Sequence, residues 1–192
     1  MVVKVVAFTV VDGKLLVFLN NGLLPQGVLQ ESESLDTAAI RIFKKFLQIL
    51  PKESYLEQLY TFSKARNIEV VYYILLPGYT LKSLANWYSL ERSDLARQED
   101  KEIISYAVQR LQWKIEYTNV VYSLLPREFT LSELQLTYEA ILGKELDKRN
   151  FRKKILFLKL LKDTGKKRTG TVARPASVYE FRKRSPVRVK VF

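Results

Sequence analysis

Two closely spaced helix boundaries constrain the fold of the C-terminal part of this chain. Thr130 favours a helix N-terminus, and Glu133 stands three positions later, where the two residues can form a capping box. Gly143 is typical of a helix end, and Asp147 can cap a new helix shortly afterwards. The sequence therefore predicts two helices joined by a short turn.

The second of these helices is predicted to run from Lys148 to about Lys162. Its apolar residues Phe151, Ile155 and Leu158 recur at helical spacing, whereas basic residues gather at its N-terminal end. Two helices joined by a short turn, the second basic at its start, are typical of a helix-turn-helix. These basic residues are Lys148, Arg149, Arg152 and Lys153.

The residues beyond this helix resemble the wing of a winged helix. A polar, basic loop is expected at 163–170, followed by short strands at 171–173 and 177–181. In DNA binding, the helix N-terminus would read base edges in the major groove, and the wing would meet phosphates. Base and adjacent phosphate contacts are expected from Lys148, Arg149, Asn150 and Arg152. Backbone contacts are expected from Lys153, Lys166, Lys167 and Arg168, while Arg174 contacts DNA or braces the wing.

The charge of the chain is concentrated in the same region. The sequence carries 32 Lys and Arg against 20 Asp and Glu, a formal charge of +12. Residues 1–116 hold 14 basic and 13 acidic residues, so residues 117–192 carry +11. Such an excess favours a nucleic-acid partner, although a solvated helix face or a winged helix that contacts protein would share it. The lack of His and Cys excludes zinc fingers, disulfides and a Ser-His-Asp triad.

The N-terminal half alternates between strand and helix signals. Apolar β-rich residues at 2–11 precede Asp12-Gly13, a hairpin signal, and Ser34 can cap a helix that Pro51 would end. Further strands are expected at 14–19, 56–62 and 69–76, and a second helix at 94–112. No stretch reaches the ~18 apolar residues of a membrane span, and the N-terminus lacks the layout of a signal peptide. We therefore expect a cytoplasmic α/β protein without a membrane partner.

The stretch from Leu24 to Leu35 resembles the start of a Nudix box. Gly27, Glu33 and Arg41 stand at the positions that this family's pattern requires, although Gln26 replaces a glycine. The resemblance implies that these residues, Gln26 included, lie at a small-molecule site. The alternative is a salt bridge in which Glu33 and Arg41 tie the loop to the helix.

The catalytic carboxylates of the Nudix box are missing. Nudix hydrolases hold Mg²⁺ near a diphosphate, and a hard divalent cation needs carboxylate oxygens. The matching positions are Ile42, Lys45 and Phe46, none of which is acidic. We therefore expect no enzyme activity, no catalytic residue and no metal site.

Four ordered blocks identify a more specific relationship. The chain resembles the Nudix-related transcriptional regulators of the NrtR type, with the likeness strongest over 113–181. The blocks are 116–120, 124–135, 146–155 and 174–181. Trp87-Tyr88 also matches the family's pattern, whereas Asp100 replaces a common histidine and the loop at 63–67 is shortened.

The resemblance implies two domains and a function. A mixed-sheet, Nudix-like α/β/α sandwich that binds an effector and dimerises would span 1–114, and an α+β winged helix-turn-helix domain would span 115–192. The protein would be a dimeric repressor of NAD or sugar metabolism that reads a palindromic operator in double-stranded DNA. Its effector would be ADP-ribose or a sugar, and no other cofactor is expected.

Two other functions remain open from the sequence. The chain could be a divergent nucleotide-diphosphate hydrolase with a nucleic-acid-binding appendage, which Lys45 and Phe46 argue against. It could also have lost its ligand and serve only as a dimerisation platform.

Overall fold

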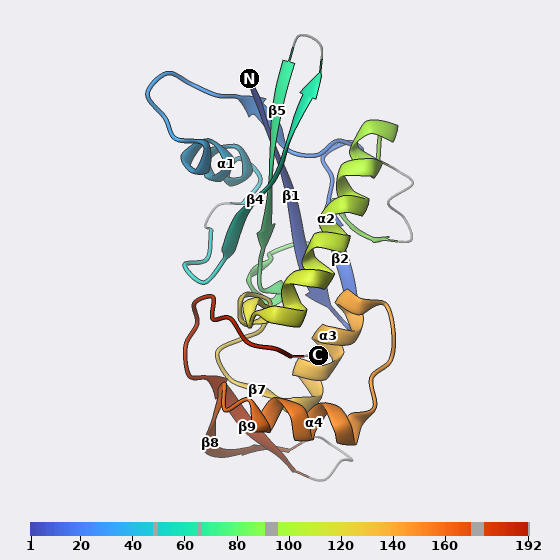
Figure 1. The fold of residues 1–192 in the computed structure, drawn as a ribbon, viewed down its shortest axis with the longest axis vertical. Coiled ribbons are helices and arrows are strands. Elements are labelled where there is room, and N and C mark those ends of the chain that lie inside the picture. The colour runs from blue at the N-terminus through green and yellow to red at the C-terminus, as the bar shows by residue number, and fades with distance from the viewer. Residues whose placement is uncertain (48–49, 65–66, 91–95, 170–174, 192) are drawn as a thin grey trace.

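The computed structural model describes residues 1–47, 50–64, 67–90, 96–169 and 175–191. Figure 1 shows a long molecule with the β-sheet of the N-terminal half at one end and helix α4 with strands β8 and β9 at the other. No helix among the described residues is long and apolar enough to cross a membrane.

A mixed six-stranded sheet forms the N-terminal half. Strand β1 (Val2–Val11) lies in its centre, parallel to β5 and antiparallel to β2 and β3. The strand order is β4-β5-β1-β2-β6, and β3 pairs with β1 outside this path. The other strands are β2 (Lys14–Phe18), β3 (Gln26–Val28), β4 (Tyr55–Lys64), β5 (Asn67–Leu75) and β6 (Trp87–Ser89). The predicted hairpin is confirmed, since Asp12 and Gly13 both have the positive φ (49° and 70°) that a tight β1–β2 turn requires.

One helix covers each face of this sheet. Helix α1 (Leu35–Lys44) packs on one face and α2 (Gln98–Tyr117) on the other. Because side chains alternate along a strand, β1 sends Val3, Val5 and Ala7 into the α1 core, and Val6 and Phe8 into the α2 core. The expected α/β/α sandwich is confirmed.

The predicted helix after Ser34 is shorter than expected. Ser34 caps α1 as predicted, because its Oγ accepts a hydrogen bond from the Thr37 amide at 3.1 Å. The helix then ends at Lys44 rather than at Pro51. The Phe46 amide instead donates to the Phe43 carbonyl, and the Phe46 ring packs 5.2 Å from that of Phe18. Residues 45–47 are thus not helical, and the predicted residues 48 and 49 lie outside the described part of the chain.

The second predicted helix is also displaced. Helix α2 spans Gln98–Tyr117, so it continues five residues beyond the predicted end at Gln112, and Ile115 in this extension is fully buried. The predicted start at Asp94 lies outside the described residues.

The C-terminal part is a small helical unit with a three-stranded sheet. It contains α3 (Leu131–Leu142), α4 (Lys148–Phe157) and the strand order β7-β9-β8. The strands are β7 (Phe129–Thr130), β8 (Leu161–Arg168) and β9 (Ala176–Phe181), and short 3₁₀ turns lie at Gly78–Thr80 and Val120–Ser123. The expected winged helix-turn-helix is confirmed.

Two predictions in this part are wrong in detail. Helix α4 ends at Phe157 rather than near Lys162, because the chain reverses at Lys159 (φ 54°) and places Leu161 in the core. The segment predicted as a loop from residue 163 is strand up to Arg168, since it pairs with β9. The strand predicted at 171–173 lies outside the described residues.

The two halves share one core. The apolar cluster beneath α2 continues from Phe8 on β1 to Phe151 on α4 and Phe181 on β9. The residues after β9 return to α2, where the amides of Val189 and Val191 donate to the carbonyls of Tyr117 and Glu116 at 2.9 and 2.7 Å. Helix α2 itself runs through position 114, so the division at 114/115 remains a prediction.

Candidate nucleic-acid interface and effector region

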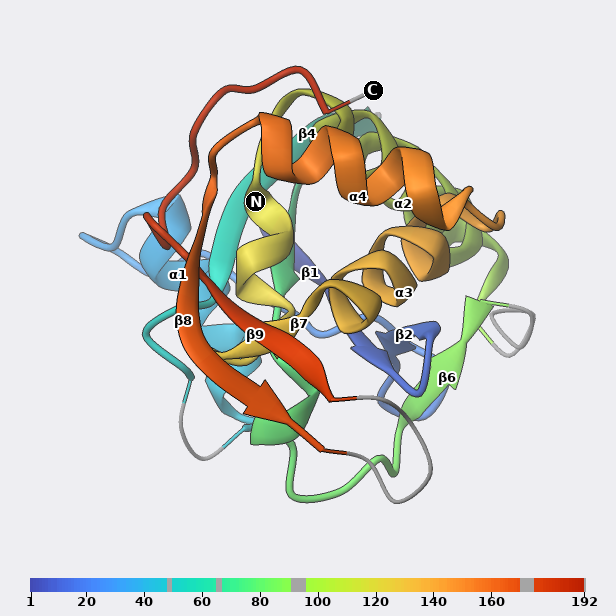
Figure 2. The same cartoon turned by 90° about the horizontal axis from the view of Figure 1, so that it is seen from below.

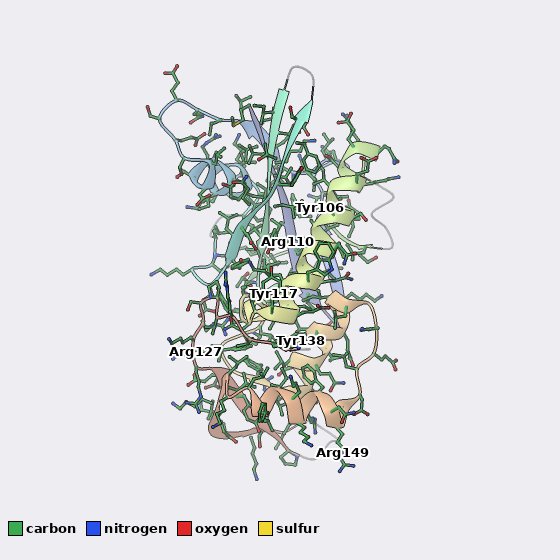
Figure 3. The ribbon with its side chains drawn as sticks, viewed as in Figure 1. Tyr106, Arg110, Tyr117, Arg127, Tyr138 and Arg149 are labelled. Atoms are coloured by element: carbon green, nitrogen blue, oxygen red, sulfur yellow. The ribbon has the colours of Figure 1, made fainter. Side chains whose placement is uncertain are left out.

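The N-terminal turns of α4 present a basic surface. Asp147 caps the helix, its Oδ1 accepting a hydrogen bond from the Asn150 amide at 2.7 Å. Phe151 and Ile155 are buried and anchor one side of the helix in the core. The opposite side exposes Lys148, Arg149, Asn150 and Lys153. Figure 3 shows the Arg149 side chain projecting from this end of the molecule.

Specific polar contacts hold both the start of α3 and the turn between α3 and α4. The capping box is present: the Glu133 amide donates to Thr130 Oγ1 (3.2 Å), and the Thr130 amide donates to Glu133 Oε2 (2.6 Å). Gly143 ends α3 with a φ of 65°. Glu139 Oε1 then accepts a hydrogen bond from the Leu146 amide at 2.9 Å. The conformation of Gly143 and the Glu139–Leu146 hydrogen bond shape the turn from which α4 begins.

Arg152 is positioned differently from the other predicted DNA contacts. Its side chain is half-buried, and Nη2 donates to Ser132 Oγ on α3 at 3.2 Å. The structure thus brings Arg152 against α3 rather than onto the exposed side with Arg149.

Strand β8 carries the basic residues of the wing. Gly165 adopts a φ of 74° within a register shift between Asp163 and Lys167, so the strand bends there. Lys166, Lys167 and Arg168 follow this bend and are all exposed. Figure 2 looks at the molecule from this end and shows α4 and the β8–β9 pair on the same face.

Two acidic residues hold the wing cations close to α3. Lys166 Nζ lies 2.6 Å from Glu128 Oε1, and Arg168 Nη1 lies 2.5 Å from Glu133 Oε1. The sequence predicted Glu133 only as a helix cap and did not single out Glu128, because these pairs join residues 38 and 35 positions apart. Arg174 lies outside the described residues.

Two of the four predicted effector residues, Glu33 and Arg41, form an ion pair. Arg41 Nε donates to Glu33 Oε2 at 3.0 Å, Arg41 Nη2 donates to the Val28 carbonyl, and the Gln30 amide donates to Glu33 Oε1. The hydrogen bond from Arg41 holds the pKa of the Glu33 carboxyl below its usual range. The pair ties the loop after β3 to α1, the structural alternative raised by the sequence.

The other two predicted effector residues lie on β3. Gln26 is exposed, while Gly27 lies against α1, where an added Cβ would meet Ile42 Cγ1 at 3.1 Å. This close approach explains why a glycine suits position 27.

The Nudix positions that would carry glutamates do not fit a Mg²⁺ ion. Ile42 is buried beside Gly27, Lys45 is exposed, and the ring of Phe46 packs on Phe18. None of these side chains offers an oxygen ligand. In the described part of the chain, no three His, Cys, Asp or Glu side chains gather in a group suited to a metal ion.

A pocket beside α1 lies away from the predicted effector residues. A cavity of about 560 Å³ opens beside the end of α1, lined by residues that include Phe18, Phe46 and Trp87. None of the four predicted effector residues is among its described lining residues. In the sequence, Trp87 matches the family pattern and Phe46 replaces a Nudix glutamate. The sequence did not predict that these two residues line the same pocket.

Comparison with known proteins gives independent information on this chain. The family model for the NrtR DNA-binding winged helix domain matches residues 121–181. A curated relative from Acinetobacter baylyi, an "ADPR responsive transcriptional repressor NtrR", is 36% identical over 100 residues. That alignment covers 50% of this chain and 39% of the relative.

Solved structures resemble the whole chain. NrtR from Shewanella oneidensis, crystallised with a 27mer DNA, is 30% identical with a TM-score of 0.80, and the match covers 95% of this chain and 93% of that one. A MutT/nudix family protein from Enterococcus faecalis has a TM-score of 0.72 over 95% of this chain and 87% of its own, but its 21% identity supports only a common fold. Given the winged-helix match and the full-length similarity to the S. oneidensis protein, the chain belongs to the NrtR family.

Proposed function

We propose that this protein is a DNA-binding transcriptional repressor whose DNA affinity is controlled by a small-molecule effector. The observation that carries the proposal is the exposed basic start of α4 beside the basic wing at one end of the molecule. A helix N-terminus projecting from a rigid core can enter the major groove, and an adjacent strand pair can follow the backbone. The A. baylyi and S. oneidensis relatives support the same function.

The exposed side of α4 supplies the contacts that would read sequence. In this proposal Arg149 and Asn150 contact base edges, and Lys148 and Lys153 contact adjacent phosphates. Lys167 contacts the backbone from the wing, whereas the predicted backbone contacts of Lys166 and Arg168 compete with their ion pairs to Glu128 and Glu133. Arg152, which was predicted as a base or phosphate contact, is proposed instead to position α4, since its Nη2 donates to Ser132 Oγ on α3.

The unit that binds DNA is proposed to be a homodimer. Two copies related by a two-fold axis would match the half-sites of a palindromic operator. Residues 1–114 would supply dimerisation and the effector site, and residues 115–192 would read DNA. Analytical ultracentrifugation would test this assembly, and a monomer bound to a single half-site would refute it.

The effector is proposed to be ADP-ribose, bound without being hydrolysed. The responsive A. baylyi relative supports this ligand. Lys45 and Phe46 at the positions of Nudix carboxylates support a non-enzymatic role, since neither can hold Mg²⁺. Magnesium-dependent turnover of ADP-ribose or NADH that is lost in Glu33→Gln would instead establish a hydrolase.

DNA binding can be tested by fluorescence anisotropy with DNA from the region preceding the protein's own gene and a scrambled duplex of equal composition. Arg149→Ala should weaken binding to the specific duplex by ~1–3 kcal/mol and affect the scrambled duplex less, since a lost base contact relaxes discrimination. Lys167→Ala should weaken binding to both equally and reduce the salt slope by about 0.9.

Lys44→Ala provides the matched control. It removes the same charge from an exposed position at the end of α1, so both duplexes should bind as they do to the unaltered protein. If Arg149→Ala and Lys167→Ala also leave binding unchanged, α4 and the wing are not the DNA interface. If DNA binds but no ligand alters its affinity, the N-terminal half serves only as a dimerisation platform.

A further inference from the structure

The pocket beside α1 is built from aromatic rings. Phe18 at the end of β2 and Trp87 at the start of β6 are 4% and 8% exposed, and Phe46 follows the last turn of α1. The Phe18 ring centroid lies 5.2 Å from that of Phe46 and 5.4 Å from that of Trp87. The volume of the pocket, about 560 Å³, lies in the usual range of ligand sites.

The polar side chains among the described lining residues of this pocket come from one segment. Thr80, Lys82 and Asn86 belong to the segment between β5 and β6, and Lys82 and Asn86 are exposed. The described lining residues at and beyond the end of α1 are Phe46, Leu47 and Pro51, none of which carries a hydrogen-bonding side chain. A bound molecule would therefore need an apolar, flat portion inside the pocket and a polar portion at its rim.

Phe46 gives this pocket its particular chemistry. The residue stands at a position where the Nudix pattern has a glutamate, so an aromatic ring occupies the place of a metal-binding carboxylate. The preceding residue, Lys45, adds a positive charge where a second carboxylate would stand. The change removes the attraction for a cation and creates a surface on which a planar ring can stack.

We propose that this pocket binds the base of a nucleotide effector against Phe46 and Trp87, without a divalent cation. The inference rests on the proposed effector control and names the site and the ligand class. Every nucleobase has a π-face that stacks on aromatic side chains. The phosphates of the nucleotide would remain at the rim of the pocket near Lys82. A free pentose would instead bury hydroxyls against apolar walls, where they lack hydrogen-bond partners and binding is penalised.

Tryptophan fluorescence can test this pocket directly, because the protein has only two tryptophans. Trp113 is 47% exposed on α2, so Trp113→Phe leaves Trp87 as the single emitter. Titration of that variant with ADP-ribose in the presence of EDTA should change Trp87 emission in a saturable manner. Trp87→Phe, which retains Trp113, should show no saturable change and is the matched control.

Two substitutions at position 46 then distinguish stacking on the aromatic ring from contact with any apolar side chain. In the Trp113→Phe background, Phe46→Leu keeps an apolar wall but removes the ring, and should raise the Kd for ADP-ribose on the order of tenfold. Phe46→Tyr keeps the ring and should stay within about twofold of the parent. Circular dichroism melting of both variants confirms that they fold, so a loss in Phe46→Leu alone reports stacking.

Several results would overturn the proposal. A requirement for Mg²⁺ would restore the metal-dependent alternative, and equal affinity for ribose 5-phosphate would show that the base contributes nothing. Equal Kd values for Phe46→Leu and Phe46→Tyr would remove the ring from the site. If ADP-ribose alters DNA affinity in the unaltered protein but never Trp87 emission, the effector binds elsewhere and effector control stands. If ADP-ribose alters neither, the proposed effector control fails as well.

Discussion

Replacing Glu128 with glutamine should tighten DNA binding, because it releases a wing cation that the fold holds back. Lys166 Nζ lies 2.6 Å from Glu128 Oε1, and the two side chains are 63% and 39% exposed. An ion pair this exposed contributes little to stability, so Glu128→Gln should fold normally. The substitution frees Lys166 for phosphate and removes a carboxylate that repels the backbone.

The size of the effect follows from counterion release. One additional phosphate contact steepens the dependence of log K on log salt by ~0.9. Over a fourfold rise in salt, from about 50 to about 200 mM, the gain in the binding constant from that contact falls about 3.5-fold. The affinity ratio of Glu128→Gln to the unaltered protein should therefore be largest at low salt and fall by about that factor across the range.

Anisotropy titrations at four salt concentrations would measure this slope, with Glu102→Gln as the matched control. Glu102 is exposed on α2, whose first turns lie far from α4 and the wing, and the control changes the net charge by the same amount. An equal gain in both variants would show a general charge effect. An unchanged slope in Glu128→Gln would show that Lys166 does not reach phosphate, and would refute the reasoning.

Three further predictions concern the packing of α4, the ionisation of Glu57, and the coupling between the effector site and DNA binding. Ile155→Ala, at a side chain 2% exposed, should lower the free energy of unfolding by ~2–5 kcal/mol in urea titration, whereas Leu156→Ala, 46% exposed, should change it by less than ~0.5 kcal/mol. Burial opposes ionisation of Glu57, but hydrogen bonds from Lys114 and two tyrosines outweigh it and lower its pKa. The stability that ionised Glu57 contributes is present at neutral pH and is lost as the pH falls below the usual carboxyl pKa and through the lowered pKa, so the stability difference from Glu57→Gln should shrink over that acidic range. The side chain of Leu136 on α3 lies beside Gly13 in the β1–β2 turn. Leu136→Ala should reduce the factor by which ADP-ribose changes the DNA Kd. An unchanged factor would show that this contact does not couple the effector site to DNA binding.

Features encoded within a few residues were predicted well. Ser34, Thr130 and Asp147 cap their helices as expected, because each cap joins a side chain to a backbone amide three positions away. The hairpin turn at Asp12-Gly13 depends on two adjacent residues and was predicted equally well. Such signals require no knowledge of tertiary contacts.

Features that depend on distant partners were missed or misplaced. Strand β8 is polar and mostly exposed, so it lacks an alternating apolar pattern, and its pairing with β9 decides its conformation. The predicted end of α4 failed for the same reason, since Leu161 is buried as part of strand β8, where it pairs with Phe181 on β9. The pocket joins Phe18, Phe46 and Trp87 from three separate elements, and nothing local links them.

Strand β2 offers a short physical connection between the proposed effector pocket and the DNA reader. Phe18 at its end lines the pocket, while Gly13 in the turn at its start lies against α3, where an added Cβ would stand 3.9 Å from Leu136 Cδ2. At ~3.3 Å per residue, the five residues of β2 span about 17 Å. Because β2 is hydrogen-bonded to β1 and β6 along this length, a ring that displaces Phe18 or Trp87 acts on a stiff element rather than on a flexible linker. An effector can change DNA affinity only by favouring one placement of α3 and α4 over another, and β2 contacts both the ligand's proposed site and α3.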